Sequence, residues 1–127
     1  MTDTGMGNDQ PSVDELTSRL IEFRDARDWR QFHSLKDLIV SLNLEASELL
    51  ELTQWKSEKI FEEALESDKE MQRNLREECA DVFIYLLLIA ERAGIDIQRA
   101  AAQKIADNGI KYPVAKARGM TTKYNKL

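Results

Sequence analysis

Apolar residues recur every three or four positions along most of the chain, which is the spacing of an amphipathic α-helix. No stretch shows the strict alternation of apolar and polar residues that marks a half-buried strand, and no internal repeat is present. The pattern therefore predicts an all-α protein. The four long helices are expected over residues 12–29, 35–53, 67–94 and 96–109.

Residues that favour helix ends support these limits. At the start of the first three helices a serine precedes an acid by three residues, which is the spacing of a capping box. Asp96 is a favourable N-cap for the fourth helix, and Gly94 is suited to end the third. On the fourth helix we expect Ile97, Ala101 and Ile105 to face inward. The three capping pairs are Ser12 with Glu15, Ser34 with Asp37, and Ser67 with Glu70.

The remaining segments are less regular. Residues 1–11 lack periodicity and are expected to form a disordered leader, followed by a single domain over residues 12–127. Residues 54–66 are ambiguous, because they are rich in acids and hold only Ile60, Phe61 and Leu65 as anchors for a short helix. The stretch after residue 109 contains a proline and a glycine, so we expect at most one turn of helix there.

The third predicted helix is apolar on all sides between Val82 and Ala90. A helix of this kind is buried on more than one side, and a small helical domain covers only part of it. We therefore expect the chain to self-associate, with the surplus apolar surface at a subunit interface. The alternative is a helix at the centre of a monomer.

Four carboxylates interrupt the apolar stripes of the second and third helices. Glu45 lies near the middle of one stripe and Glu78 near the middle of the other, and a second acid follows each after three residues, Glu48 and Asp81. If both stripes face inward, four negative charges meet where removing one unpaired carboxylate from water costs several kcal/mol. Such a cluster requires a cation.

The ligand types indicate which metal this would be. Carboxylate oxygens suit Mg²⁺, with Mn²⁺ as a substitute, whereas Zn²⁺ prefers nitrogen and sulfur ligands. The single histidine, His33, lies outside both pairs, so a di-iron site with Glu-x-x-His motifs is disfavoured. Acidic pairs at this spacing also occur elsewhere, as in Glu63 with Glu66, and most such pairs are solvated helix faces.

Charge and composition narrow the classes of partner. The net charge of −5 disfavours bulk nucleic-acid binding. Residues 104–127 hold six basic residues and one acid, which suits a ligand with phosphates, although a solvated basic tail is the alternative. The lone Cys79 excludes an internal disulfide, no signal peptide is apparent, and the longest apolar run is too short to span a membrane. A cytoplasmic protein is expected.

The sequence also resembles a known family. Residues 29–56 (WRQFHSLKDLIVSLNLEASELLELTQWK), 75–86 (LREECADVFIYL) and 104–124 (KIADNGIKYPVAKARGMTTKY) closely resemble the all-α MazG-like nucleoside triphosphate pyrophosphohydrolases, in particular their dCTP pyrophosphatase branch. The likeness extends over about residues 13–125.

The resemblance implies a four-helix bundle that assembles as a homotetramer, a dimer of dimers, and hydrolyses nucleoside triphosphates to monophosphate and pyrophosphate. Glu45, Glu48, Glu78 and Asp81 match the family's Mg²⁺ ligands. Some of the matching pocket positions are contributed across the subunit interface. The positions that match the family's nucleotide pocket are Trp29, Trp55, Tyr85, Lys104, Asn108, Lys111 and Tyr112.

One position departs from the dCTP-preferring relatives. A histidine of those relatives lies nine residues before the tryptophan that matches Trp29, and Leu20 stands there in this chain. The loss of a hydrogen bond to the base edge predicts looser base choice, with dCTP among the substrates and dATP accepted. The rival interpretation is a non-catalytic helical interaction protein with a degenerate metal site.

Overall fold

The computed structural model describes residues 10–126 of the chain, and within that range it contains helices and no strand. The predicted all-α class is therefore confirmed. The α-helices are α2 (Val13–Ala26), α3 (Leu35–Glu51), α4 (Glu58–Ser67), α5 (Lys69–Ala93), α6 (Ile97–Lys111) and α7 (Val114–Ala117), with short 3-10 helices η1 (Arg30–Phe32) and η2 (Tyr124–Lys126).

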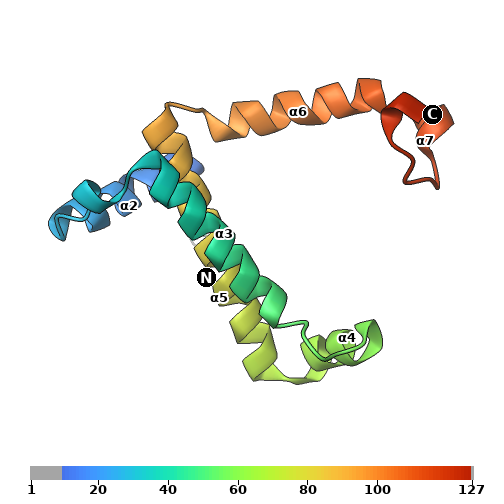
Figure 1. Cartoon of the computed structure of the whole chain (residues 1–127), viewed down its shortest axis with the longest axis horizontal. Coiled ribbons are helices and arrows are strands. Elements are labelled where there is room, and N and C mark those ends of the chain that lie inside the picture. Colours follow the sequence, from blue (N-terminus) through green and yellow to red (C-terminus); the bar gives the residue numbers. More distant parts are fainter. Residues whose placement is uncertain (1–9, 127) are drawn as a thin grey trace, which may run out of the picture. The chain divides into compact units, whose positions relative to one another are not determined.

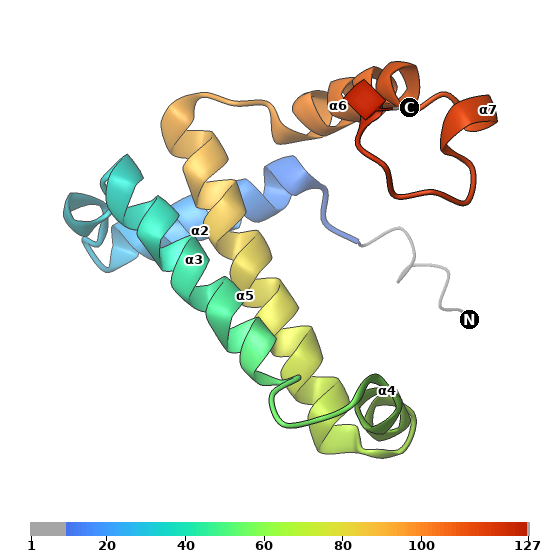
Figure 2. The ribbon, with the colours of Figure 1, turned by 45° about the vertical axis from the view of Figure 1, so that its right-hand side comes forward.

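The chain divides into two compact units, residues 1–94 and 95–127. In the first unit α3 and α5 run side by side in opposite directions, as both views show (Figures 1 and 2), and α2 and α4 also pack against α5. The second unit consists of α6, α7 and η2. The prediction of a single domain over residues 12–127 stays a prediction.

The core of the first unit lies along the face that α5 presents to α3 and α2. Leu87 is 1% exposed, and Leu38 of α3 is also buried. Leu88 and Ala90 complete this buried set. The apolar residues of α5 thus provide the surface on which the other helices of the unit pack around the site described below.

Side-chain caps begin the helices where the sequence predicts them, with one exception. The hydroxyl of Ser12 accepts the N–H of Glu15 at 3.1 Å, and Ser34 caps α3 in the same way. The predicted cap at Ser67 is wrong. Ser67 is the last residue of α4, and the carboxylate of Asp68 instead accepts the first N–H groups of α5.

The C-terminal helix differs from its prediction in length and burial. Asp96 caps α6 as expected, but the helix continues past Asn108 and Gly109 to Lys111. The expectation that Ile105 faces inward is wrong within this unit, where the residue is 72% exposed. The predicted single turn is present as the four residues of α7.

Most of the ambiguous segment, residues 54–66, belongs to a regular helix, α4. The hydroxyl of Ser57 accepts the N–H of Ile60 and so begins α4. Phe61, Ala64 and Leu65 are the half-buried residues of this helix. None of the helices in residues 10–126 is both long and apolar enough to cross a bilayer.

Candidate functional site

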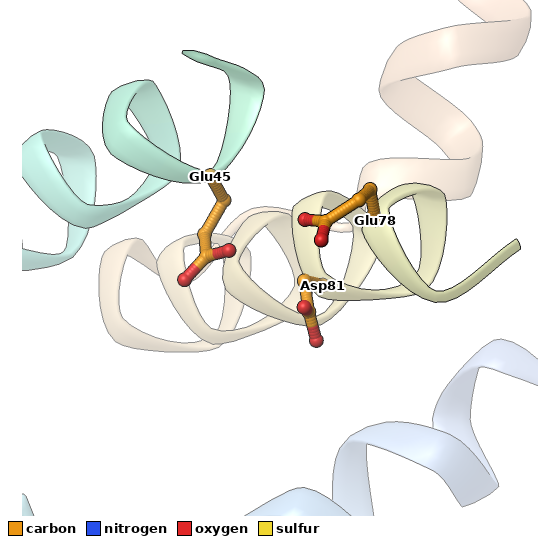
Figure 3. A group of neighbouring side chains, drawn as sticks. All are labelled: Glu45, Glu78 and Asp81. Carbon is orange, nitrogen blue, oxygen red and sulfur yellow. The ribbon is translucent and has the colours of Figure 1, made fainter. Parts of the chain in front are cut away.

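Three of the four predicted metal ligands come together between α3 and α5. Glu45 projects from α3, and Glu78 and Asp81 project from successive turns of α5 into the same space (Figure 3). One carboxylate oxygen from each lies within 4.8 Å of the others. All three residues are half-buried. The inward stripes predicted from the sequence therefore do converge on a carboxylate cluster.

Glu48, the fourth predicted ligand, lies one turn beyond Glu45 on α3 and is more exposed than the other three. Its carboxylate is near enough to Glu45 and Glu78 to influence both. It is outside the group of three whose oxygens lie closest together. We therefore name Glu45, Glu78 and Asp81 the acidic cluster and treat Glu48 as its neighbour.

The electrostatics of the acidic cluster show uncompensated negative charge. Burial raises the pKa of Glu45 above its ordinary value, and a hydrogen bond with Glu48 and the neighbouring acid charges raise it further. Burial is also the main reason that the pKa of Glu78 is raised, followed by the charges of Glu48 and Asp81. Like charges and loss of water both favour the protonated carboxyl.

The same two glutamates each have a carboxylate oxygen without a hydrogen-bond partner. In the part of the chain that the structure describes, Oε2 of Glu45 and Oε2 of Glu78 are buried and have no hydrogen-bond partner. The ion pairs of Arg24 with Asp25 and Glu91, and of Arg99 with Asp96, do not involve the acidic cluster. Buried polar atoms without partners are uncommon in folded proteins and require an explanation, such as an ion.

A pocket of about 670 Å³ opens beside the acidic cluster. Two members of the cluster, Glu45 and Asp81, belong to its wall, and most of the remaining wall is apolar. Its other lining residues are Leu16, Arg19, Leu20, Phe23, Arg24, Trp29, His33, Ala80, Phe83, Ile84, Tyr85, Leu87 and Leu88. An apolar cavity with a few polar groups at one side is typical of a small-molecule site.

A tight turn after α2 places an aromatic ring on the pocket. Asp28 adopts a left-handed backbone conformation with φ of 54°. The N–H of Trp29 then donates to the carbonyl of Arg24 at 3.0 Å. The Trp29 ring packs edge-to-face on Phe23, with 5.8 Å between ring centroids. The guanidinium of Arg27 lies 3.6 Å from the centroid of the Phe23 ring.

The other predicted pocket residues differ in where the structure places them. Tyr85 lines the pocket, and its contact with a nucleotide stays a prediction. Trp55 lies in the connection between α3 and α4, where it is fully exposed and has a positive φ of 63°, and it does not line this pocket. The remaining four belong to the second unit, and their part in the site stays a prediction. They are Lys104, Asn108, Lys111 and Tyr112.

The sequence interpretation missed much of the α2 wall. Leu20 was expected beside the base, whereas Arg19 and Arg24 were not considered as pocket residues. The signal was present, because Leu16, Arg19, Leu20, Phe23 and Arg24 follow the spacing of one helix face. Part of the apolar surface of α5 that was expected at a subunit interface lines the pocket instead. These residues are Phe83, Ile84, Leu87 and Leu88.

Known proteins resemble the chain in sequence and in fold. Residues 40–127 match the model of the MazG-like family. The dCTP pyrophosphatase 1 of Rattus norvegicus is 38% identical and that of Homo sapiens 36% identical, each over 118 residues that cover 93% of this chain and 69% of the relative. A pyrophosphatase from Archaeoglobus fulgidus has a crystal structure that matches with a TM-score of 0.74 and 40% identity, covering 82% of this chain and 94% of that one.

These matches agree with one another. The family model matches most of the chain. Both this match and the alignments with the relatives cover the segment that carries Glu45, Glu78 and Asp81. The solved structure extends the agreement to the arrangement of the helices. The chain therefore belongs to the MazG-like family, as the resemblance of its sequence predicted.

Proposed function

We propose that the chain hydrolyses nucleoside triphosphates, dCTP among them, to the monophosphate and pyrophosphate with the help of Mg²⁺. The relatives confirm the broader class, a nucleoside triphosphate pyrophosphohydrolase. The observation that carries the proposal is that Glu45 and Asp81 belong at once to the acidic cluster and to the wall of the pocket. A nucleoside in the pocket would hold its phosphates at the cluster.

The acidic cluster fits a hard divalent cation. Its donors are carboxylate oxygens, which suit Mg²⁺ and Mn²⁺. The buried oxygens of Glu45 and Glu78 without partners are free to bind such an ion. Its positive charge would offset the loss of water and the neighbouring negative charges that raise the pKa of both groups. Glu45, Glu78 and Asp81 would hold the ion, and Glu48 is close enough to join them.

The reaction requires a water molecule to attack the α-phosphorus as the bond to the pyrophosphate oxygen breaks. A divalent cation supplies charge neutralisation on the phosphate oxygens and activates water. The carboxylates would fix the position of that charge, and we propose that one of the glutamates accepts the proton of the attacking water. The apolar wall excludes bulk water from the nucleoside, and the Trp29 ring offers a surface for stacking.

The base preference is proposed to be loose. Leu20 lines the pocket, so this part of the wall offers the base an apolar side chain and no hydrogen bond. A site that reads a base edge rejects analogues because a buried polar group is otherwise left unpaired. Without that penalty at Leu20, we propose that dATP is accepted in addition to dCTP.

The products of dCTP hydrolysis test this function. The proposed cleavage at the α-phosphorus yields dCMP and intact pyrophosphate, because the bond between the β- and γ-phosphates is never attacked. Anion-exchange chromatography of a reaction with Mg²⁺ should show both products in equal amounts. The appearance of dCDP with free phosphate, or no turnover of any of the eight common triphosphates, would refute the proposal.

We also propose that the protein is a homotetramer. Ile39, Val40 and Leu44 of α3 are each about half exposed or more, and they lie on one side of the helix. Burying such a face against another subunit gains about 25 cal/mol per Å² of apolar surface. Multi-angle light scattering should give four times the mass of 14.6 kDa. A fully active monomer would show that assembly is dispensable.

The rival proposal is an interaction protein whose acidic cluster binds no metal. It predicts that Mg²⁺ and a non-hydrolysable nucleotide leave the melting temperature unchanged, whereas a ligand that binds the native state must raise it. The unpartnered oxygens of Glu45 and Glu78 favour the enzyme, because a surface that only binds proteins has no need of them.

A further inference from the structure

One charged residue is buried in the wall of the pocket. Arg24 is 5% exposed, and it is the one charged or polar residue in the buried class within residues 10–126. It lines the pocket together with apolar residues of α2 such as Leu20 and Phe23. A buried guanidinium is costly unless carboxylates or other acceptors engage its N–H groups. Its presence in this wall therefore requires a reason.

Two carboxylates that are more exposed than Arg24 hold its guanidinium. Nε of Arg24 donates to Oδ1 of Asp25 at 3.0 Å, and Nη1 donates to Oε2 of Glu91, in α5, at 3.4 Å. The side chains of Asp25 and Glu91 are 53% and 35% exposed, against 6% for Arg24. A guanidinium has five donors in a rigid plane. The two hydrogen bonds fix that plane and leave donors for a ligand in the pocket.

The same residue is tied to the aromatic ring of the pocket. Its carbonyl accepts the N–H of Trp29, whose side chain is part of the wall. The Trp29 ring is suited to the face of a base, and a fixed guanidinium is suited to the edge of a base. The two residues together form a site that can contact both the face and the edge of a nucleobase.

We infer that Arg24 determines base specificity by donating two parallel hydrogen bonds to neighbouring acceptors on the edge of the base. This rests on the proposed function, since it names which nucleotides that site prefers. Cytosine presents O2 beside N3, and guanine presents O6 beside N7. Adenine and thymine alternate donors with acceptors along their edges, so neither offers such a pair. The pocket therefore accepts all four bases and binds cytosine and guanine more tightly.

Binding of four α,β-imido deoxynucleoside triphosphates tests this inference. The titrations are followed by calorimetry with Mg²⁺ present, on the wild type and on Arg24→Met, Arg24→Lys and Arg30→Met. The wild type should bind the cytosine and guanine analogues about tenfold more tightly than the adenine and thymine analogues, as expected for one bidentate contact. Both Arg24 variants should lose this ratio. Arg30→Met, which removes an exposed arginine outside the pocket, should keep it.

The lysine variant separates recognition from folding. Arg24→Lys retains a charge that can pair with Glu91 but loses the planar fork, so a structural role predicts an unchanged ratio and the inference predicts its loss. If Arg24→Met fails to fold, by circular dichroism, Arg24→Lys alone decides. A ratio near one in the wild type, or a ratio preserved in Arg24→Lys, overturns the inference.

The binding assay also separates this inference from the proposed function. The analogues are not cleaved, so the ratio is measured whether or not the protein hydrolyses triphosphates. An intact ratio with no pyrophosphate released from dCTP would refute the proposed function and keep the inference. Failure of every analogue to bind the wild type would overturn both.

Discussion

Glu78→Gln is expected to lower kcat for dCTP hydrolysis at least about a hundredfold, because it removes a charged ligand from the metal site while preserving the shape of the side chain. Glu78 holds a buried oxygen without a partner and lies within 4.8 Å of the ligand atoms of Glu45 and Asp81. Steady-state kinetics at saturating Mg²⁺ measure the loss. The matched control is Glu63→Gln, on exposed α4, which should keep wild-type kcat.

The same variant should stabilise the protein when no metal is present. The pKa of Glu78 is raised in the folded state, so its contribution to stability is fully present below the unfolded pKa and is lost as the pH rises through the folded pKa. A raised pKa means that the charged form of Glu78 destabilises the folded state at neutral pH, and the neutral glutamine removes this destabilisation. The melting temperature in EDTA should therefore rise for Glu78→Gln at pH 7, and the gain should shrink as the pH falls. A variant that is inactive because it is unfolded would show the reverse.

Leu87→Ala is expected to lower the free energy of unfolding by about 2–5 kcal/mol, the range for removing a large side chain from a packed core. Leu87, in the C-terminal half of α5, is 1% exposed and also lines the pocket. Urea denaturation of the metal-free protein measures the change. Because natural domains are stable by about 5–15 kcal/mol, the variant would lose a large part of the total.

Leu50→Ala is the matched control for this substitution. The residue type and the change are the same, but Leu50 is 63% exposed on α3. Its truncation should change the free energy of unfolding by about 0.5 kcal/mol or less. Equal effects of the two substitutions would contradict the placement of the core along α5.

The helices were predictable because local chemistry sets their ends. Ser12 and Asp96 cap the helices that follow them, and Gly94 ends α5 in the left-handed conformation with φ of 69°. The error at Ser67 has a simple cause. Ser67 and Asp68 are both good caps, and the choice depends on where α4 ends, which the ambiguous composition of residues 54–66 did not reveal.

The acidic cluster was predictable, whereas the burial of Arg24 in the α2 wall was not. Glu45 and Glu78 interrupt apolar stripes, so their inward direction follows from periodicity alone. An arginine on a helix face is ordinarily solvent-exposed. The burial of Arg24 depends on Glu91, which is 67 residues away in the sequence, and such a contact leaves no local signal. The positions of Lys104 and Asn108 relative to the pocket likewise depend on more than local pattern.

The central claim is that the acidic cluster holds a divalent cation beside the pocket. Electron paramagnetic resonance of Mn²⁺ titrated into the wild type with an α,β-imido dCTP analogue tests this claim directly. We expect the wild type to bind Mn²⁺ saturably, and excess Mg²⁺ should displace the Mn²⁺. Glu78→Gln and Asp81→Asn should each abolish Mn²⁺ binding or weaken it at least about tenfold. Mn²⁺ binding of equal strength in the wild type and both variants would contradict the account.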